Sequence, residues 1–264
     1  MINWSLFFVL WGLSLFGAAA ILPYGFAMSG SQLANVPMSR PKLIAVSLLN
    51  SAVLMTVAVF VGLLAAQAVG LGAPVIEAAL SGQPLLPALA AVPLAIVLGV
   101  LSTSLVVLLE MRVFRPHLPQ ALQQVDQNMA LWKRLLASFY GGISEEILLR
   151  WFVMSGVVWL GSRLTGGVAT DAMFWFAIVF AAVLFGLGHL PATARLTPLT
   201  PLILTRAILL NGLVGIATGY LFWHYGIEAA MIAHFSGDIV LHVLTPMFTQ
   251  PRTDANRPTA THPA

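Results

Sequence analysis

Long apolar runs, separated by short polar or proline-rich segments, dominate the chain. A helix that crosses a bilayer needs about 20 predominantly apolar residues, and each run is close to that length or longer. The runs cover residues 2–22, 43–70, 88–109, 135–160, 172–190, 200–223 and 227–247. The pattern predicts seven transmembrane helices. If there is an eighth, re-entrant span, we expect it in the loop 71–87.

The most polar interior stretch, residues 110–134, has a different pattern. Leu118, Leu122, Val125 and Met129 recur at spacings of three or four, with glutamines and charged residues between them. This spacing gives a helix one apolar face. The stretch therefore predicts an amphipathic linker helix that lies at the membrane surface.

Composition agrees with a membrane protein and excludes several other classes. The chain is 59% hydrophobic and only 8% charged, whereas a soluble domain carries about 25% charged residues. We therefore expect an all-α fold, a polytopic transmembrane helix bundle of about seven or eight spans, surrounded by the lipid bilayer. The absence of cysteine excludes disulfides and thiol nucleophiles. No basic stripe interleaved with aromatic residues is present, so nucleic acid is not an expected partner.

One integral-membrane domain over residues 1–248 accounts for the apolar runs. The last residues, 249–264, are polar and rich in proline and threonine, which predicts a disordered tail. Because cytoplasmic loops of membrane proteins carry an excess of Lys and Arg, the basic residues orient the chain. With seven spans, Arg163 lies in a loop on one side, and those on the other side are Arg40, Lys42, Arg112, Arg115, Lys133, Arg134, Arg195, Arg252 and Arg257. The prediction is a multi-pass protein of the cell (inner) membrane, with its amino terminus outside and its carboxyl tail cytoplasmic.

Three charged residues interrupt the apolar run 135–160. Glu145, Glu146 and Arg150 fall within six positions, although one charge at the bilayer centre costs at least about 2.5–3.5 kcal/mol. Glu146 and Arg150 are four residues apart, so they share a helix face and are expected to form an ion pair. Glu145 is turned by about 100° from Glu146, which leaves Glu145 without a local partner.

Two later apolar runs also carry polar residues. His189 ends the run 172–190, and His234 and Asp238 lie four apart inside the run 227–247. Taken singly, His189 is typical of a hydrogen-bonding histidine, the Glu146–Arg150 pair of a structural ion pair, and His234 with Asp238 of either a proton relay or a hydrolytic site. Because leaving them apart in lipid is costly, we expect one polar cavity that collects them all.

These residue types suit the hydrolysis of an amide. A carboxylate and a neutral histidine can together deprotonate a water molecule. A second histidine and an aspartate can donate a hydrogen bond to the developing oxyanion, or can orient the donor that does so. The alternative is a zinc site formed by Glu145, His189 and His234, in which the metal activates the water. A His-Glu-x-x-His pair, the usual zinc-protease motif, is absent from the sequence.

The motifs resemble those of a known family. Glu145-Glu146-x3-Arg150, Phe185-x3-His189 and His234-x3-Asp238, in this order on successive apolar runs, resemble the CPBP (CAAX protease/bacteriocin-processing, Abi) intramembrane proteases, also described as type II CAAX prenyl endopeptidase-like. The resemblance covers about residues 135–245, the expected protease core. Asp238 stands where eukaryotic CAAX enzymes typically have asparagine. Because an ionised aspartate only accepts hydrogen bonds, Asp238 is expected to be protonated or to orient His234.

The resemblance implies a role for each motif residue. It implies that Glu145 acts with His189 as the base that activates water, and that His234 and Asp238 stabilise the tetrahedral oxyanion. The implied catalytic residues are Glu145, His189, His234 and Asp238, and the supporting residues are Glu146 and Arg150. We therefore expect an intramembrane glutamic endopeptidase that needs no cofactor and cleaves a membrane-associated peptide or protein. The alternatives are a zinc-dependent form of the same protease, a proton-coupled membrane transporter and a non-catalytic membrane adaptor.

Overall fold

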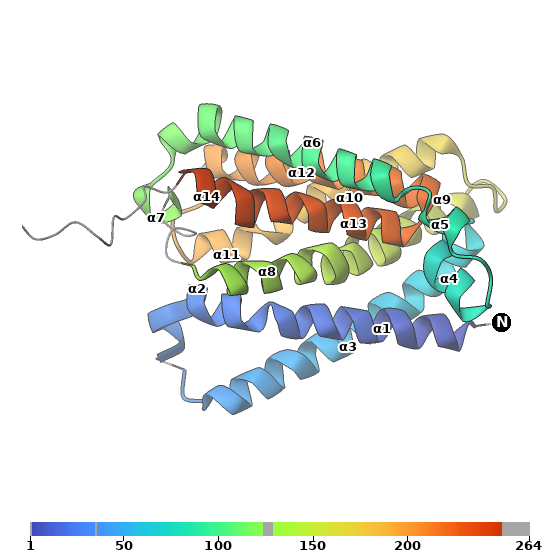
Figure 1. The fold of residues 1–264 in the computed structure, drawn as a ribbon, viewed down its shortest axis with the longest axis horizontal. Coiled ribbons are helices and arrows are strands. Elements are labelled where there is room, and N and C mark those ends of the chain that lie inside the picture. The colour runs from blue at the N-terminus through green and yellow to red at the C-terminus, as the bar shows by residue number, and fades with distance from the viewer. Residues whose placement is uncertain (1, 35, 124–128, 250–264) are drawn as a thin grey trace, which may run out of the picture.

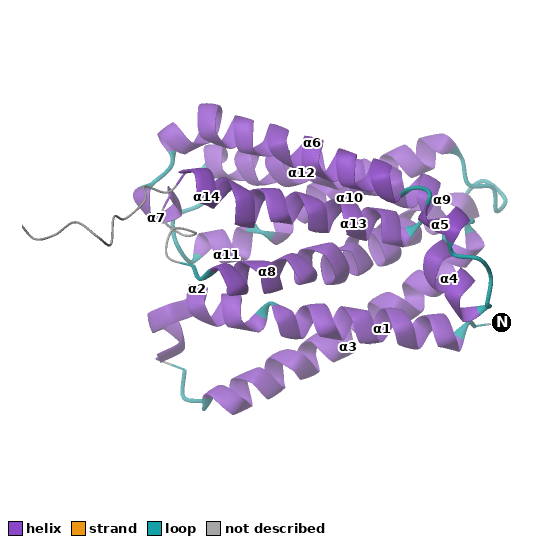
Figure 2. Ribbon diagram, viewed as in Figure 1, coloured by secondary structure: helices purple, strands orange, loops and turns teal. Residues whose placement is uncertain are grey.

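The computed structural model describes residues 2–34, 36–123 and 129–249, and the described chain is helical without strands (Figures 1 and 2). The α-helices are α1 (Trp4–Ala20), α2 (Leu22–Ala34), α3 (Arg40–Ala68), α4 (Pro74–Leu80), α5 (Leu86–Leu89), α6 (Val92–Leu109), α7 (Gln120–Gln123), α8 (Leu131–Phe139), α9 (Ser155–Arg163), α10 (Asp171–Gly188), α11 (Leu190–Ala194), α12 (Pro201–Tyr225), α13 (Ile227–Asp238) and α14 (Thr245–Thr249). Four π-helical segments, η1 (Glu110–Phe114), η3 (Tyr140–Glu145), η4 (Ile147–Met154) and η5 (Ile239–Leu244), and one 3₁₀ turn, η2 (Arg115–His117), join some of them. The all-α prediction is confirmed.

Six of the described helices are long and apolar enough to cross a membrane, which makes this a multi-pass membrane protein. They are Trp4–Gly30, Arg40–Ala68, Leu86–His117, Asp171–Ala194, Pro201–Tyr225 and Ile227–Met247. The expected number, seven or eight, was therefore too high by this measure. The difference lies in the helix over residues 131–163, which is not among the six and carries Glu145, Glu146 and Arg150.

The acidic helix, residues 131–163, lies within the bundle and is surrounded by the apolar helices. Its η3 segment packs against α1 and α13, and its η4 segment packs against α3 and α10. Charged side chains in membrane proteins usually face the bundle interior. The surrounding helices thus provide the environment in which this helix can hold its three charges.

The stretch 71–87, where an eighth span was sought, contains only the seven-residue helix α4 and the first residues of the span Leu86–His117, so it adds no span. The continuous amphipathic helix expected over 110–134 is wrong where the chain is described, because the short helix α7 follows the turn η2 and Leu118 lies outside both. Pro116 and Pro119 lack the amide hydrogen that a continuous helix needs. Residues 124–128, the remainder of that prediction, lie outside the described residues, as does nearly all of the predicted tail 249–264.

Small residues allow the helices near the polar cluster to approach closely, as is common in membrane bundles. A Cβ atom added at Gly99 of α6 would overlap the Ala233 carbonyl of α13, and one at Gly237 would overlap the Thr103 hydroxyl. A Cβ at Gly186 of α10 would meet the α12 backbone in the same way. The spacing of α6, α10, α12 and α13 thus depends on these glycines.

The start of α13 is fixed to the loop before α4. Gly226 precedes α13 with φ +90, a left-handed conformation that favours glycine. The Ile227 amide donates to the Gly72 carbonyl at 3.1 Å. The Glu228 carboxylate accepts a hydrogen bond from the Ile76 amide at 2.8 Å. These contacts set the height at which α13 enters the bundle and therefore the height of the residues it carries.

Candidate active site

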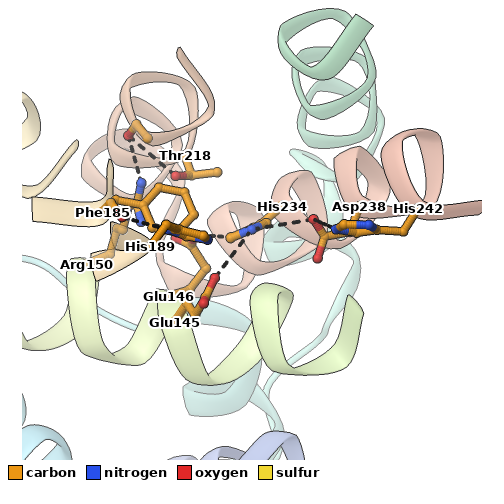
Figure 3. Close-up of polar contacts among 10 residues, drawn as sticks. Glu145, Glu146, Arg150, Phe185, His189, Thr218, His234, Asp238 and His242 are labelled. Carbon is orange, nitrogen blue, oxygen red and sulfur yellow. Dashed lines mark hydrogen bonds and ion pairs between the residues drawn. The ribbon is translucent and has the colours of Figure 1, made fainter. Parts of the chain in front are cut away.

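The predicted polar residues from three helical segments meet in one cluster (Figure 3). Glu145, Glu146 and Arg150 come from the acidic helix, His189 ends α10, and His234 and Asp238 lie on α13. Phe185 of α10 lies at the centre, since its ring contacts His189 at 5.0 Å and His234 at 5.4 Å between centroids. The structure therefore brings together the four predicted catalytic residues and the two supporting ones.

One half of the cluster is fully buried. Arg150 Nη1 lies 3.2 Å from Glu146 Oε1, and both side chains are 0% exposed, so the expected ion pair is present. Arg150 Nη2 also donates to the Gly215 carbonyl of α12 at 2.9 Å. Glu146 has a second partner that the sequence did not reveal, because its Oε1 lies 2.7 Å from His234 Nδ1. This contact fixes the orientation of the His234 ring and turns its Nε2 away from Glu146.

The other half of the cluster faces open space. His234 Nε2 lies 3.9 Å from Glu145 Oε2 and 3.7 Å from Asp238 Oδ1. Asp238 Oδ1 is in turn 4.0 Å from His242 Nε2. These separations exceed direct hydrogen-bond lengths, but they suit a bridging water. Glu145 and Asp238 keep 20% and 14% of their side chains exposed, so both can meet a substrate.

His189 is oriented by its own helix. Its Nδ1 lies 2.9 Å from the Phe185 carbonyl oxygen. Because a carbonyl oxygen only accepts, Nδ1 carries the hydrogen and Nε2 of the neutral ring is left as an acceptor. His189 and Glu145 line the same cavity. This is the tautomer in which His189 can take a proton from water.

The backbone around Glu145 is shaped for close contact with α13. The turn η3 is π-helical, a form that often occurs at functional sites. Gly141 faces the catalytic side, because an added Cβ would overlap Asp238 Oδ2 and lie 3.1 Å from His234 Nε2. A Cβ at Gly142 would lie 2.8 Å from Phe235 Cβ. Gly141 and Gly142 thus allow the acidic helix to approach α13 closely.

A cavity of about 800 Å³ connects this cluster to the ends of α6 and α12. Glu145, His189, His234 and Asp238 line one part of it, and Tyr140 lies among them. Glu110, Arg115, Arg206 and Asn211 line the other part. Sequence reasoning missed the ion pair between Glu110 and Arg206, whose atoms lie 2.7 and 3.0 Å apart. The signal was present, since both charges lie inside apolar helices.

The zinc ligands considered from the sequence do not converge on one point. Among the described residues, no group of three or more His, Cys, Asp and Glu side chains is arranged to hold a metal ion. As arranged, Glu145, His189 and His234 therefore do not form the expected zinc site.

Comparison with known proteins agrees with the motifs. Residues 127–240 match the family model of the type II CAAX prenyl endopeptidase Rce1-like proteins. No match was found among curated proteins or among solved structures. The matched range contains all six predicted site residues and the helices that hold them. This match over residues 127–240 confirms the resemblance to the Rce1-like type II CAAX prenyl endopeptidases, a family that implies a protease.

Proposed function

We propose that the protein is an intramembrane endopeptidase that hydrolyses a peptide bond with a water molecule activated by Glu145 and His189. The observation that carries the proposal is the placement of His234. Glu146 holds His234 Nδ1 at 2.7 Å, and Nε2 lies 3.9 Å from Glu145 Oε2 and 3.7 Å from Asp238 Oδ1, with all three residues on the wall of the cavity. A nucleophile and a proton donor can therefore act on the same carbonyl group.

The steps follow from these positions. Glu145 takes a proton from the water, with His189 Nε2 as a second acceptor, and the hydroxide attacks the carbonyl carbon. Protonated His234 donates from Nε2 to the oxygen that becomes negative, while Nδ1 donates to Glu146. The carbon–nitrogen bond then breaks, and the proton held by Glu145 passes to the leaving amine.

Three carboxylates stabilise the protonated form of His234. Glu146, Glu145 and Asp238 lie 2.7, 3.9 and 3.7 Å from its ring nitrogens, and nearby negative charges favour an imidazolium. Asp238 then acts as an acceptor that orients His234, which needs no amide at this position. Arg150 supplies a positive charge 3.2 Å from buried Glu146.

The substrate is expected to be a membrane-associated peptide or protein. The cavity extends from the catalytic cluster to the ends of α6 and α12, where Arg115 and Arg206 lie. We propose that this end faces the cytoplasm of the cell membrane, in keeping with the bias of basic loop residues. The described chain begins at one end of the bundle and α14 lies at the other (Figure 1), as an amino terminus outside and a carboxyl terminus inside require.

Loss of Glu145 is the test. Glu145→Ala, His189→Ala and His234→Ala should each abolish proteolysis while the protein still inserts and folds. The substrate is sought by comparing the peptides of wild-type cells with those of Glu145→Ala cells, where an uncut peptide should accumulate. Cleavage of that peptide by purified Glu145→Ala protein would exclude the mechanism.

The zinc-dependent alternative is separated by metal analysis and a chelator. The glutamate mechanism predicts that purified protein stripped with a strong chelator cleaves its substrate at the unchanged rate. Loss of activity on chelation, with recovery on adding zinc alone, would favour the metal-dependent form.

A further inference from the structure

A second charged group lies on the cavity wall, away from the catalytic cluster. Glu110 and Arg115 lie near the end of the membrane helix Leu86–His117, and Arg206 lies near the start of Pro201–Tyr225. All three residues line the cavity that contains Glu145 and His234. The proposed chemistry uses none of these three charges.

Arg206 is held in place with part of its guanidinium unused. Its Nε and Nη2 donate to the two oxygens of Glu110 at 2.7 and 3.0 Å, a bidentate contact. Its Nη1 makes no hydrogen bond or ion pair with the described residues. The side chain is 28% exposed. Arg206 therefore presents a fixed, accessible donor to the cavity.

Arg115 adds a charge that no carboxylate among the described residues balances. Its Nη1 contacts Met111 Sδ at 3.3 Å, and within the described part of the chain it forms no ion pair with an acidic residue. This end of the cavity thus carries two cations and one carboxylate. The opposite end carries the carboxylates of Glu145 and Asp238. The charge along the cavity wall is therefore uneven. It is positive near the C-terminal end of α6 and the N-terminal end of α12, and negative at the catalytic cluster.

We propose that Arg115 and Arg206 form a subsite for a carboxylate of the peptide substrate. Guanidinium groups bind carboxylates with paired, charge-assisted hydrogen bonds. Repulsion by Glu145 and Asp238 would keep that carboxylate away from the catalytic end, so the subsite fixes the direction and register of the peptide. This inference rests on the proposed endopeptidase function and adds the substrate class to it.

The spacing of residues along α12 sets the scale for where the carboxylate lies in the peptide. Arg206 and Gly215, whose carbonyl binds Arg150, are nine positions apart on α12, which corresponds to about 13 Å along the helix. An extended peptide covers about 3.3 Å per residue. The carboxylate therefore lies within roughly four residues of the cleaved bond, as a chain-terminal group or as an Asp or Glu side chain.

The test is cleavage of a randomised octapeptide library prepared in two forms, with free carboxyl ends and with amidated ends. Wild-type protein in detergent is compared with Arg115→Gln and with the double variant Glu110→Gln/Arg206→Gln, which removes both charges of the pair together. Arg112→Gln is the matched control, because Arg112 is exposed in the same segment and does not line the cavity. Mass spectrometry identifies the cleaved sequences.

Wild type and Arg112→Gln should prefer peptides with a carboxylate at a fixed distance from the cut. The preference should fall by roughly ten- to a hundredfold in Arg115→Gln and in the double variant, as expected for a charge-assisted contact. If the preference is found only in the library with free carboxyl ends, the bound group is the terminal carboxylate. If Asp or Glu is preferred in both the free and the amidated library, the bound group is a side-chain carboxylate. Cleavage by wild type without any charge preference would overturn the subsite and leave the endopeptidase proposal intact.

Binding provides a readout that does not depend on catalysis. The Glu145→Ala protein, with and without Arg115→Gln, is used to select peptides from both libraries, and acidic peptides should be enriched only when Arg115 is present. This enrichment would support the subsite even if no library peptide is cut. Equal recovery of acidic and neutral peptides would overturn it. Stabilisation by phosphatidylglycerol that requires Arg115, without any peptide preference, would also overturn it and assign the cations to a lipid.

Discussion

The two halves of the polar cluster differ in burial and in contact distance. Glu146 and Arg150 are 0% exposed and make contacts of 2.7–3.2 Å. Glu145 and Asp238 are 20% and 14% exposed, and their nearest charged atoms lie 3.7–4.0 Å away. His234 belongs to both halves, through Nδ1 on the buried side and Nε2 on the open side.

This difference separates the residues that hold His234 in place from those that can contact water and substrate. The buried half has direct partners that fix His234 to the acidic helix and to α12, so it is suited to keep the geometry constant. The open half leaves its oxygens at distances that a water or a substrate atom can occupy. Two adjacent glutamates thus have different tasks because one side of their helix meets packed neighbours and the other side meets the cavity.

Among the tests of this difference, Arg150→Ala should have the largest effect, on the stability of the protein. It leaves Glu146 charged, buried and without its cation, which typically costs 3–5 kcal/mol of stability. Thermal unfolding in a mild detergent should show a markedly lowered midpoint. Arg163→Ala, at the exposed end of the same helical run, should unfold close to wild type. Equal midpoints for the two variants would mean that the buried half does not hold the fold.

Gly141→Ala probes the boundary between the halves. The added methyl would press on the Asp238 carboxylate and approach His234 Nε2 to 3.1 Å. Overpacking of this kind costs about 1–3 kcal/mol, and we expect the cleavage rate to fall by roughly tenfold or more with a smaller loss of stability. Gly156→Ala is the control, since nothing lies within 4 Å of its added Cβ. An unchanged cleavage rate in Gly141→Ala would show that the open half tolerates displacement.

His242→Gln should have the smallest effect. His242 is 24% exposed and its Nε2 is 4.0 Å from Asp238 Oδ1, and such a pair contributes about 1 kcal/mol or less. We expect a change in cleavage rate of only a few fold, measured on the same substrate as Gly141→Ala. A loss as large as that of Glu145→Ala would place His242 among the catalytic residues.

The fold was largely predictable because apolar runs of bilayer length are unambiguous. The predicted run 200–223 corresponds to α12, and the run 227–247 coincides with the observed span Ile227–Met247. The pairing of Glu146 with Arg150 followed from their spacing of four residues. In each instance the information is local, since the interacting residues belong to the same helix or the same run.

Contacts between segments far apart in the sequence could not be predicted from such local patterns. His234 and Glu146 are 88 positions apart, and only the packing of α13 against the acidic helix shows which nitrogen meets which oxygen. The pair of Glu110 and Arg206 is 96 positions apart. The prediction of a linker helix over 110–134 was wrong for another reason, because its apolar spacing suggested a continuous helix that Pro116 and Pro119 interrupt.

The π-helical turn Tyr140–Glu145 makes the catalytic arrangement sensitive to chain length. Its hydrogen bonds run from residue i to i+5, so it contains one residue more than an α-helical turn. Deleting a single residue from this turn would allow regular α-helical bonding, which takes up the missing residue and leaves the helical segments on either side facing as before. The residues of the turn itself would shift, so Gly141 and Glu145 would lose the positions from which they meet Asp238 and His234, although every catalytic side chain would still be present in the sequence.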